Sequence, residues 1–229
     1  MRILHCSDFH ANRGWFHWLA QVVPQYDLVC FSGDLLDMGS PETIRCQQAE
    51  IKKTLGAIAT PFAICSGNHD MVHSDLHPEG ARWVRDLKRQ NLWVDGERFR
   101  LGGHNFYCQS WNEPIPAAQP GDIWIIHSPP EGCPAAVSKY AGDVGDFEFS
   151  QLCLNGGGPR LALCGHVHSP LSWNSVLGGT QVFNPECNAT DPCPAHIVVD
   201  LTAGTATRHG PGLPEETVLL TRTATIGQR

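Results

Sequence analysis

Five short hydrophobic runs in this chain each end in residues that bind metal ions in proteins, and this repetition is the feature that most constrains the fold. Short continuous apolar runs of this kind are typical of strands buried on both faces of a sheet. In open α/β sheets, ligands gather outside the carboxyl ends of the strands, so we expect all five clusters to converge on one rim. In chain order the clusters are Asp8-x-His10, Gly33-Asp34-x-x-Asp37, Gly67-Asn68-His69-Asp70, the single His127 and Gly165-His166-x-His168.

The N-terminal part of the chain alternates between strand and helix patterns. Strands are predicted over 2–7, 28–31 and 61–65, and helices over 15–23 and 42–58. Ser40 is the expected N-cap of the second helix, with Pro41 at its first position. This alternation predicts parallel βαβ units and a mixed α/β fold.

Beyond residue 70 the pattern changes. The sequence predicts a helix over 79–90, a meander of short strands over 92–108, and a Pro- and Gly-rich active-site loop over 128–145. Further strands are expected at 123–126, 161–164, 171–177, 180–184 and 195–201, followed by an edge strand at 218–220 and a loose tail. No linker or repeat interrupts the pattern, so we expect a single domain over residues 1–229.

Composition excludes several classes of function. The net charge is −7 over 229 residues, which disfavours a nucleic-acid polymer as partner, because such binding depends on Lys and Arg. No apolar stretch reaches the roughly 18 residues of a membrane helix. The N-terminus has the pattern of a strand rather than of a signal peptide. Ten cysteines occur without any C-x-x-C pair, as expected of reduced thiols. We therefore expect a cytoplasmic protein without a membrane partner.

The polar clusters together offer a donor set that is too large for one metal ion and suits two. Oxygen and imidazole donors without thiolate favour Mn²⁺, Fe or Zn²⁺. Two ions roughly 3.5–4 Å apart would hold both oxygens of an in-line phosphoryl displacement. The donors are two carboxylates, one amide and four imidazoles: Asp8, Asp34, Asn68, His10, His127, His166 and His168.

In order and spacing, the five clusters resemble the five motifs of the calcineurin-like metallophosphoesterase superfamily. The resemblance implies a four-layer α/β/β/α sandwich, in which helices flank two mixed β-sheets and a dimetal site lies on one edge. It places Asp8, His10 and His168 on the first ion and Asn68, His127 and His166 on the second, with Asp34 as the bridge.

The resemblance also assigns two catalytic roles. His69 would protonate the leaving group as general acid, and Asp37 would orient His69 through a hydrogen bond. Asp70 either supports a site residue through a hydrogen bond, as Asp37 would, or caps a helix. Met38 stands where the phosphoprotein phosphatases of the superfamily carry a phosphate-binding arginine. Protein phosphatase activity is therefore not expected, and Asn12 and Arg13 are the candidate substrate-binding residues.

A narrower resemblance, to the small phosphodiesterase branch of the superfamily, rests on the segments Trp111-x-x-Pro114, His127-Ser128-Pro129-Pro130 and Asn184-Pro185-Glu186-x-Asn188. We therefore predict a dimetal phosphodiesterase for small phosphodiesters such as cyclic nucleotides, acting through a metal-activated hydroxide. A phosphomonoesterase or nucleotide pyrophosphatase on the same site stays open, as does a metal-depleted protein-binding scaffold. A homo-oligomer also stays open.

Overall fold

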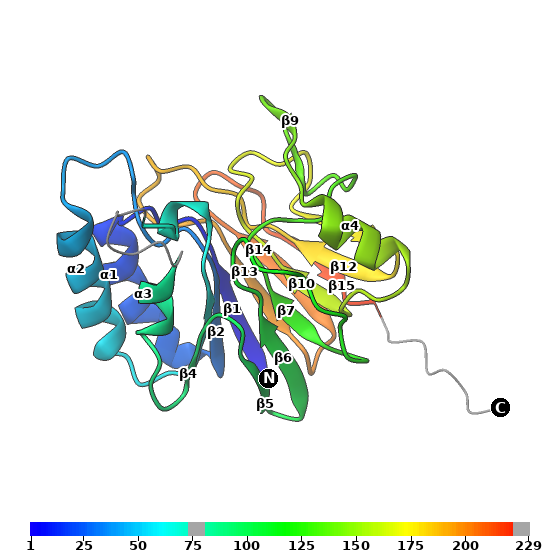
Figure 1. Cartoon of the computed structure of the whole chain (residues 1–229), viewed down its shortest axis with the longest axis horizontal. Helices are drawn as coiled ribbons and strands as arrows, with labels where there is room; N and C mark the ends of the chain where they lie inside the picture. The colour runs from blue at the N-terminus through cyan, green and yellow to red at the C-terminus, as the bar shows by residue number, and fades with distance from the viewer. Residues whose placement is uncertain (73–80, 222–229) are drawn as a thin grey trace.

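The computed structural model describes residues 1–72 and 81–221, and there two large β-sheets pack face to face between helices (Figure 1). In spatial order the first sheet contains β15 (Glu216–Leu219), β14 (Thr205–His209), β13 (His196–Asp200), β1 (Arg2–Cys6), β2 (Leu28–Ser32), β3 (Phe62–Cys65) and β4 (Leu92–Trp93). The second sheet contains β11 (Asn174–Leu177), β12 (Thr180–Phe183), β10 (Leu161–Leu163), β7 (Ile123–Ile125), β6 (His104–Cys108) and β5 (Arg98–Leu101).

Helices cover the outer faces of both sheets (Figure 1). On the first sheet lie α1 (Arg13–Val22), α2 (Ile44–Gly56) and α3 (Arg82–Arg85), with the short 3₁₀ turns η1 (Val23–Gln25) and η2 (Asn68–Asp70). On the second lies α4 (Phe147–Leu154), next to a small hairpin of β8 (Val137–Ser138) and β9 (Gly142–Asp143). This arrangement confirms the predicted α/β/β/α sandwich.

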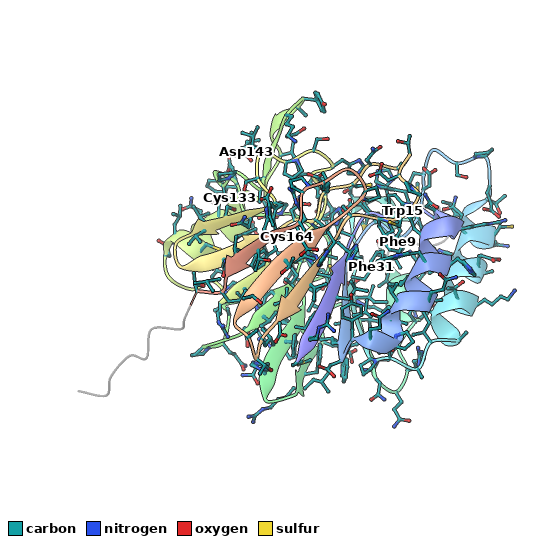
Figure 2. All side chains as sticks on the ribbon, turned by 180° about the vertical axis from the view of Figure 1, so that it is seen from behind. Phe9, Trp15, Phe31, Cys133, Asp143 and Cys164 are labelled. Atoms are coloured by element: carbon teal, nitrogen blue, oxygen red, sulfur yellow. The ribbon has the colours of Figure 1, made fainter. Side chains whose placement is uncertain are left out.

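Alternation along the central strands explains why both faces of the first sheet are buried. In β2, Leu28 and Cys30 face the second sheet, whereas Val29 and Phe31 pack against the helices. Figure 2 shows Phe31 beside Phe9 and Trp15, on the side of the sheet that α1 covers. The strands therefore have continuous apolar sequences, as predicted.

The five clusters do converge, but two sheets share the rim. β1, β2 and β3 are parallel in the first sheet, and β7 and β10 are parallel in the second. Backbone hydrogen bonds join the strand ends, from Asp8 N–H to Gly33 O at 3.0 Å and from Gly165 N–H to His127 O at 2.8 Å. The two sheets meet there, because His127 Nδ1 after β7 lies 2.7 Å from Ser32 O at the end of β2. The rim is therefore one place in space, assembled from the carboxyl ends of both sheets.

Two helix predictions need correction. The N-cap of α2 is Thr43 rather than Ser40, because the Thr43 hydroxyl accepts the Cys46 N–H at 3.3 Å. Ser40 instead accepts the Glu42 N–H at 3.1 Å, in the turn before the helix. The helix expected over 79–90 is limited to Arg82–Arg85 in the described residues, and residues 73–80 and the expected tail at 222–229 lie outside them.

Strand pairing also differs from the prediction. The meander over 92–108 is wrong, because β4 pairs parallel with β3 while β5 and β6 form a hairpin in the other sheet. The sequence prediction missed β14, whose Thr-Ala-Thr-Arg-His pattern carries little apolar signal but pairs along its length with β13.

The single-domain prediction stays a prediction. In the described part of the chain, no helix is both long and apolar enough to cross a lipid bilayer.

Candidate metal centre

Strained backbone marks the rim. Asp8, His10, Asp34 and His166 all have positive φ angles, of 57°, 44°, 57° and 68°. Residues other than glycine seldom adopt this left-handed conformation, and it is costly unless the surroundings enforce it. Four of the seven predicted ligands therefore hold conformations that turn their side chains at the ends of the strands.

The first predicted group of ligands converges around the His10 ring. Its Nε2 lies 3.1 Å from His168 Nε2, 4.0 Å from Asp8 Oδ1 and 4.0 Å from Asp34 Oδ2. His168 Nε2 also lies 3.5 Å from Asp8 Oδ1. The three side chains that the resemblance assigns to the first ion are thus together with Asp34, the predicted bridge.

The second predicted group converges around Asn68. Its Oδ1 lies 3.0 Å from His127 Nε2 and 2.9 Å from His166 Nδ1. His127 Nε2 is 3.4 Å from Asp34 Oδ2, the same oxygen that faces the first group. Asp34 therefore stands between the two groups, as a bridging carboxylate must.

These distances fit two divalent ions. Nitrogen and oxygen ligands lie about 2.0–2.2 Å from Zn²⁺, which puts neighbouring ligands roughly 3–3.5 Å apart. In two of the rings, the nitrogen that faces away from the centre also has a hydrogen-bond partner. His127 Nδ1 donates to Ser32 O at 2.7 Å, and His10 Nδ1 donates to Leu36 O at 3.3 Å. Such outer hydrogen bonds leave Nε2 as the free donor to a metal.

The charges in the centre are strongly coupled. Burial alone would lower the pKa of His127, but the Asp34 and Asp8 carboxylates outweigh it and raise that pKa to about 9. Burial disfavours ionised Asp8, yet its hydrogen bond with His168 holds its pKa below the ordinary value. Burial and the neighbouring His127 lower the pKa of His166 to about 4, which favours the neutral ring that binds metal.

Asp70 ties two loops together, which settles the role that the sequence left open. Its Oδ2 accepts the N–H of Asp34 at 2.9 Å and of Gly67 at 2.9 Å, and its Oδ1 accepts those of Leu35 at 3.0 Å and Leu36 at 3.2 Å. It caps η2 through Gly67 and also fixes the Asp34 loop. Burial and the Asp34 charge act to raise the pKa of Asp70, whereas the Gly67 and Leu36 N–H donors act to lower it.

His69 lies at the edge of the first group. Its backbone N–H donates to Asp34 Oδ1 at 2.8 Å, and its ring packs edge-on against His10 with centroids 4.6 Å apart. Its Nδ1 is buried without a hydrogen-bond partner. The ring is therefore beside the centre, with a nitrogen that the described protein groups do not occupy.

The expected hydrogen bond from Asp37 to His69 is not present among the described residues. Asp37 Oδ1 accepts the Gly39 N–H at 2.8 Å, and Asp37 N–H donates to Gln47 Oε1 at 2.9 Å. Asp37 belongs to a turn that leads into α2, and this turn occupies its carboxylate.

The two predicted substrate-binding residues have structural partners. Asn12 Oδ1 accepts the Trp15 N–H at 3.2 Å as the N-cap of α1. Arg13 forms an ion pair with Glu42 at 2.5 Å. Their contact with phosphate stays a prediction.

Sequence reasoning missed Cys187 as a neighbour of the centre, and it named the Trp111 segment only for its resemblance to the phosphodiesterase branch. Cys187 N–H donates to His168 O at 3.0 Å and its Sγ–H donates to Asp8 O at 3.3 Å, so it joins loops from both sheets. The Trp111 ring lies 5.4 Å from that of His127 and 5.6 Å from that of His166. Cys187 occupies the unspecified position of the pattern Asn184-Pro185-Glu186-x-Asn188, which was the available signal for it.

Known proteins resemble this chain in sequence and in fold. Metallophosphoesterase domain-containing protein 1 of human and of mouse are each 22% identical to this chain, over 87% of it and 71% of their own length. The crystal structure of the protein TT1561 of Thermus thermophilus shares the fold, with a TM-score of 0.58, 15% identity, and coverage of 96% of this chain and 99% of that one.

The sequence profile of the calcineurin-like phosphoesterases matches residues 1–170, the part of the chain that contains all five clusters. Because the match covers most of the chain, and the clusters it contains meet at one rim, this protein belongs to the calcineurin-like phosphoesterase family, whose members are hydrolases of phosphoester bonds.

Proposed function

We propose that this protein is a two-metal phosphodiesterase that acts on small phosphodiesters, with cyclic nucleotides among the candidate substrates. The observation that carries the proposal is the position of Asp34 Oδ2, 3.4 Å from His127 Nε2 in one group and 4.0 Å from His10 Nε2 in the other. One carboxylate oxygen between two donor groups is what a two-ion site requires. The proposed ligands are Asp8, His10, Asp34, Asn68, His127, His166 and His168.

The chain's own residues have distinct roles. Asp8 and Asp34 supply the negative charge that holds two cations, and the imidazoles and Asn68 complete the site. Two divalent ions bound there would neutralise phosphate charge and lower the pKa of a coordinated water toward ~7. His69, beside His10, is placed to deliver a proton to the departing oxygen.

Two features support a diester rather than a monoester. Met38, half exposed at 49%, stands where the phosphoprotein phosphatases carry a phosphate-binding arginine. Arg13, the predicted cationic substitute, is paired with Glu42. A diester carries one negative charge less than a monoester dianion and needs less cationic help. A phosphomonoesterase or nucleotide pyrophosphatase on the same residues is the alternative.

The test compares bis(4-nitrophenyl) phosphate with 4-nitrophenyl phosphate on protein loaded with Mn²⁺ and, in parallel, Zn²⁺. We expect the diester to have the higher kcat/KM. Faster turnover of the monoester would overturn the diester assignment and favour the alternative.

The role of His69 has its own test. The His69→Ala variant should keep both ions in elemental analysis and lose about 10²–10⁴-fold in rate, the usual range for a positioned proton donor. Loss of an ion instead would make His69 a ligand, which its position close to His10 and Asp34 also allows. Asp37→Asn serves as the matched control and should lose far less activity, because its carboxylate contacts Gly39.

The remaining assignments are proposals of the same kind. The ions are Mn²⁺, Fe or Zn²⁺, to be identified by elemental analysis of purified protein. The location is cytoplasmic, supported by ten free cysteines. The partner is a small phosphoester rather than a nucleic-acid polymer.

A further inference from the structure

A pocket of about 360 Å³ opens beside the proposed second ion position, and Trp111 forms part of its wall. The Trp111 ring lies 5.4 Å from the ring of His127 and 5.6 Å from that of His166, two proposed ligands of that ion. The volume of the pocket is in the range of small-molecule sites in proteins. A group held there would therefore lie next to a phosphate at the two ions.

The face of the Trp111 ring is not covered by another ring. Among the described residues, its aromatic contacts are with His127 at an interplanar angle of 78° and with His166 at 41°, so neither ring is stacked on it in parallel. The Trp93 ring, by contrast, is stacked on Phe99 at an angle of 3°, with centroids 3.9 Å apart. A planar ligand could be stacked on Trp111 in the way that Phe99 is stacked on Trp93.

Trp111 also differs from the buried tryptophans of the chain. It is only partly buried, and within the described parts of the chain its indole N–H has no hydrogen-bond acceptor. Tryptophans that serve a core usually have such an acceptor. Four buried tryptophans do, with N···O distances of 2.9, 3.0, 3.2 and 2.9 Å: Trp15, Trp83, Trp124 and Trp173. Trp111 therefore has the environment of a contact surface rather than that of a core residue.

The loop that carries Trp111 is fixed at several points. The Trp111 N–H donates to Ser66 Oγ at 3.0 Å, in the loop after β3. The buried amide of Gln109 donates from Nε2 to Ser110 O at 2.9 Å and to Glu113 O at 3.0 Å, on either side of Trp111 in the sequence. A wall that is already ordered loses little conformational entropy when a ligand binds.

The rest of the wall suits an uncharged group. Ile115 and Ile126 give it an apolar part. Its charged lining residues are Glu113, Asp146 and Glu148, and no Lys or Arg is among the lining residues that the structure describes. A second phosphate placed here would meet like charge, whereas an uncharged ring would bury apolar surface.

We propose that Trp111 determines substrate specificity by packing against a neutral, planar aromatic group on one ester arm of the substrate. Aromatic pairs are more stable than their buried area alone accounts for, so Trp111 should distinguish a flat ring from a saturated ring of similar size. Ile115 and Ile126 add apolar contact. This inference rests on the proposed diesterase function and deepens it, since it names the chemistry of the ester arm beside the second ion.

The test compares benzyl methylphosphonate with cyclohexylmethyl methylphosphonate by calorimetry on Mn²⁺-loaded protein. Both ligands carry one negative charge and one six-membered ring, and neither has a second aromatic group that could enter the pocket. We expect the benzyl ester to bind about threefold to tenfold more tightly. Equal affinities, or tighter binding of the cyclohexylmethyl ester, would overturn the proposal.

Variants at two aromatic positions locate the effect. Trp111→Leu should remove the preference for the benzyl ester, and Trp111→Phe should retain part of it, because phenylalanine keeps a smaller ring. Tyr140→Leu is the control and should leave the preference as it is, since Tyr140 is 88% exposed in the turn between β8 and β9 and does not line the pocket. The preference is a ratio of two affinities for one variant, so altered occupancy of the ions affects both ligands alike. A wild-type preference in Trp111→Leu would contradict the role given to Trp111.

A nucleobase and a simple aryl ring share this chemistry, and a second pair of ligands distinguishes them. Thymidine 5′-methylphosphonate is compared with the same compound lacking the base. An affinity gain of about threefold or more from thymine supports the proposal and assigns a nucleobase. A benzyl preference without any gain from thymine supports it and assigns a simple aryl ester.

These binding measurements also separate the inference from the proposed function. If the protein prefers the benzyl ester but hydrolyses neither 4-nitrophenyl substrate, the aromatic subsite at Trp111 stands and the diesterase assignment fails. If it hydrolyses the diester without preferring the benzyl ester, the diesterase assignment stands and the aromatic subsite fails.

Discussion

The Asp70 carboxylate accepts the backbone N–H of Asp34 at 2.9 Å. The buried Asp70 therefore fixes the backbone of Asp34, the proposed bridging residue. Each Asp70 oxygen receives two backbone donors, from the loops after β2 and β3. An amide at this position would turn an NH₂ group toward two of those donors. We therefore expect Asp70→Asn to lower the free energy of unfolding by about 1–3 kcal/mol.

Urea unfolding of the metal-free protein measures this loss, and metal titration should show weaker binding of both ions. Asp37→Asn is the control, because Asp37 Oδ1 accepts a single N–H from Gly39, in the exposed turn before α2. If the two variants lose equal free energy of unfolding, Asp70 stabilises the fold no more than an ordinary turn residue does.

Two glycines of the rim leave no room for a side chain. A Cβ on Gly67 would lie 2.3 Å from Asp34 Oδ1 and 2.7 Å from His127 Cε1. A Cβ on Gly165 would lie 1.7 Å from Ser7 Oγ and 2.4 Å from Asp8 Oδ2. Gly67→Ala and Gly165→Ala should therefore displace ligands and abolish binding of both ions, as elemental analysis would show.

The matched control is Gly56→Ala at the end of α2, where a Cβ meets nothing within 4 Å. This variant should bind both ions and be more stable by about 0.4–1 kcal/mol, because alanine restricts the unfolded chain. Retention of both ions by Gly67→Ala would contradict the close packing described at the rim.

Metal stoichiometry distinguishes the bridge from the terminal ligands. Because Asp34 Oδ2 faces both groups, Asp34→Ala should lose both ions. Asn68 contacts only His127 and His166 among the described ligands, so Asn68→Ala should weaken one ion and leave the other. Calorimetric titration with Zn²⁺ counts the sites, and loss of a single ion from Asp34→Ala would remove the bridging role.

The convergence of the predicted ligands at one rim was predictable because each cluster follows its strand directly. A strand and the cluster after it are local in sequence, so an apolar run ending in Asp8 or His127 carries both the structure and the chemistry. Contacts between distant segments were not predictable in this way. Cys187 reaches Asp8 across 179 positions, and Asp37, near in sequence to Asp34, turns toward Gly39 instead of His69. β14 was missed because its Thr-rich pattern depends on its partners rather than on its own apolar residues.

His196 makes stability depend on pH away from the rim. Its ring packs between Trp18 and His209, at centroid distances of 4.8 and 5.2 Å, and burial lowers its pKa from 6.5 to about 4. Between these values the unfolded chain binds a proton that the folded protein does not, so this contribution to stability falls as pH falls from 6.5 to 4.

His196→Phe should remove that slope, because phenylalanine retains the ring packing and does not titrate. Urea unfolding at intervals from about pH 7 to about pH 4 measures it, with exposed His17→Gln as the control. A wild-type slope in His196→Phe would assign the pH dependence to other groups.

Cys187 contacts the first group of predicted ligands through two hydrogen bonds, one from its backbone N–H to the carbonyl of His168 and one from its thiol to the carbonyl of Asp8. Burial raises the pKa of this thiol far above its usual range, consistent with an S–H donor. Cys187→Ala should weaken the ion bound by Asp8, His10 and His168 by about tenfold or more, as losses of such supporting contacts do. Cys187→Ser keeps a donor and should stay closer to the wild-type affinity, and exposed Cys46→Ala should leave it unchanged.

Titration with Co²⁺ also tests for direct ligation, because a sulfur ligand adds a near-ultraviolet charge-transfer band. If that band appears in the wild type and both Cys187 variants lose affinity equally, the sulfur binds the ion and the positioning role is wrong.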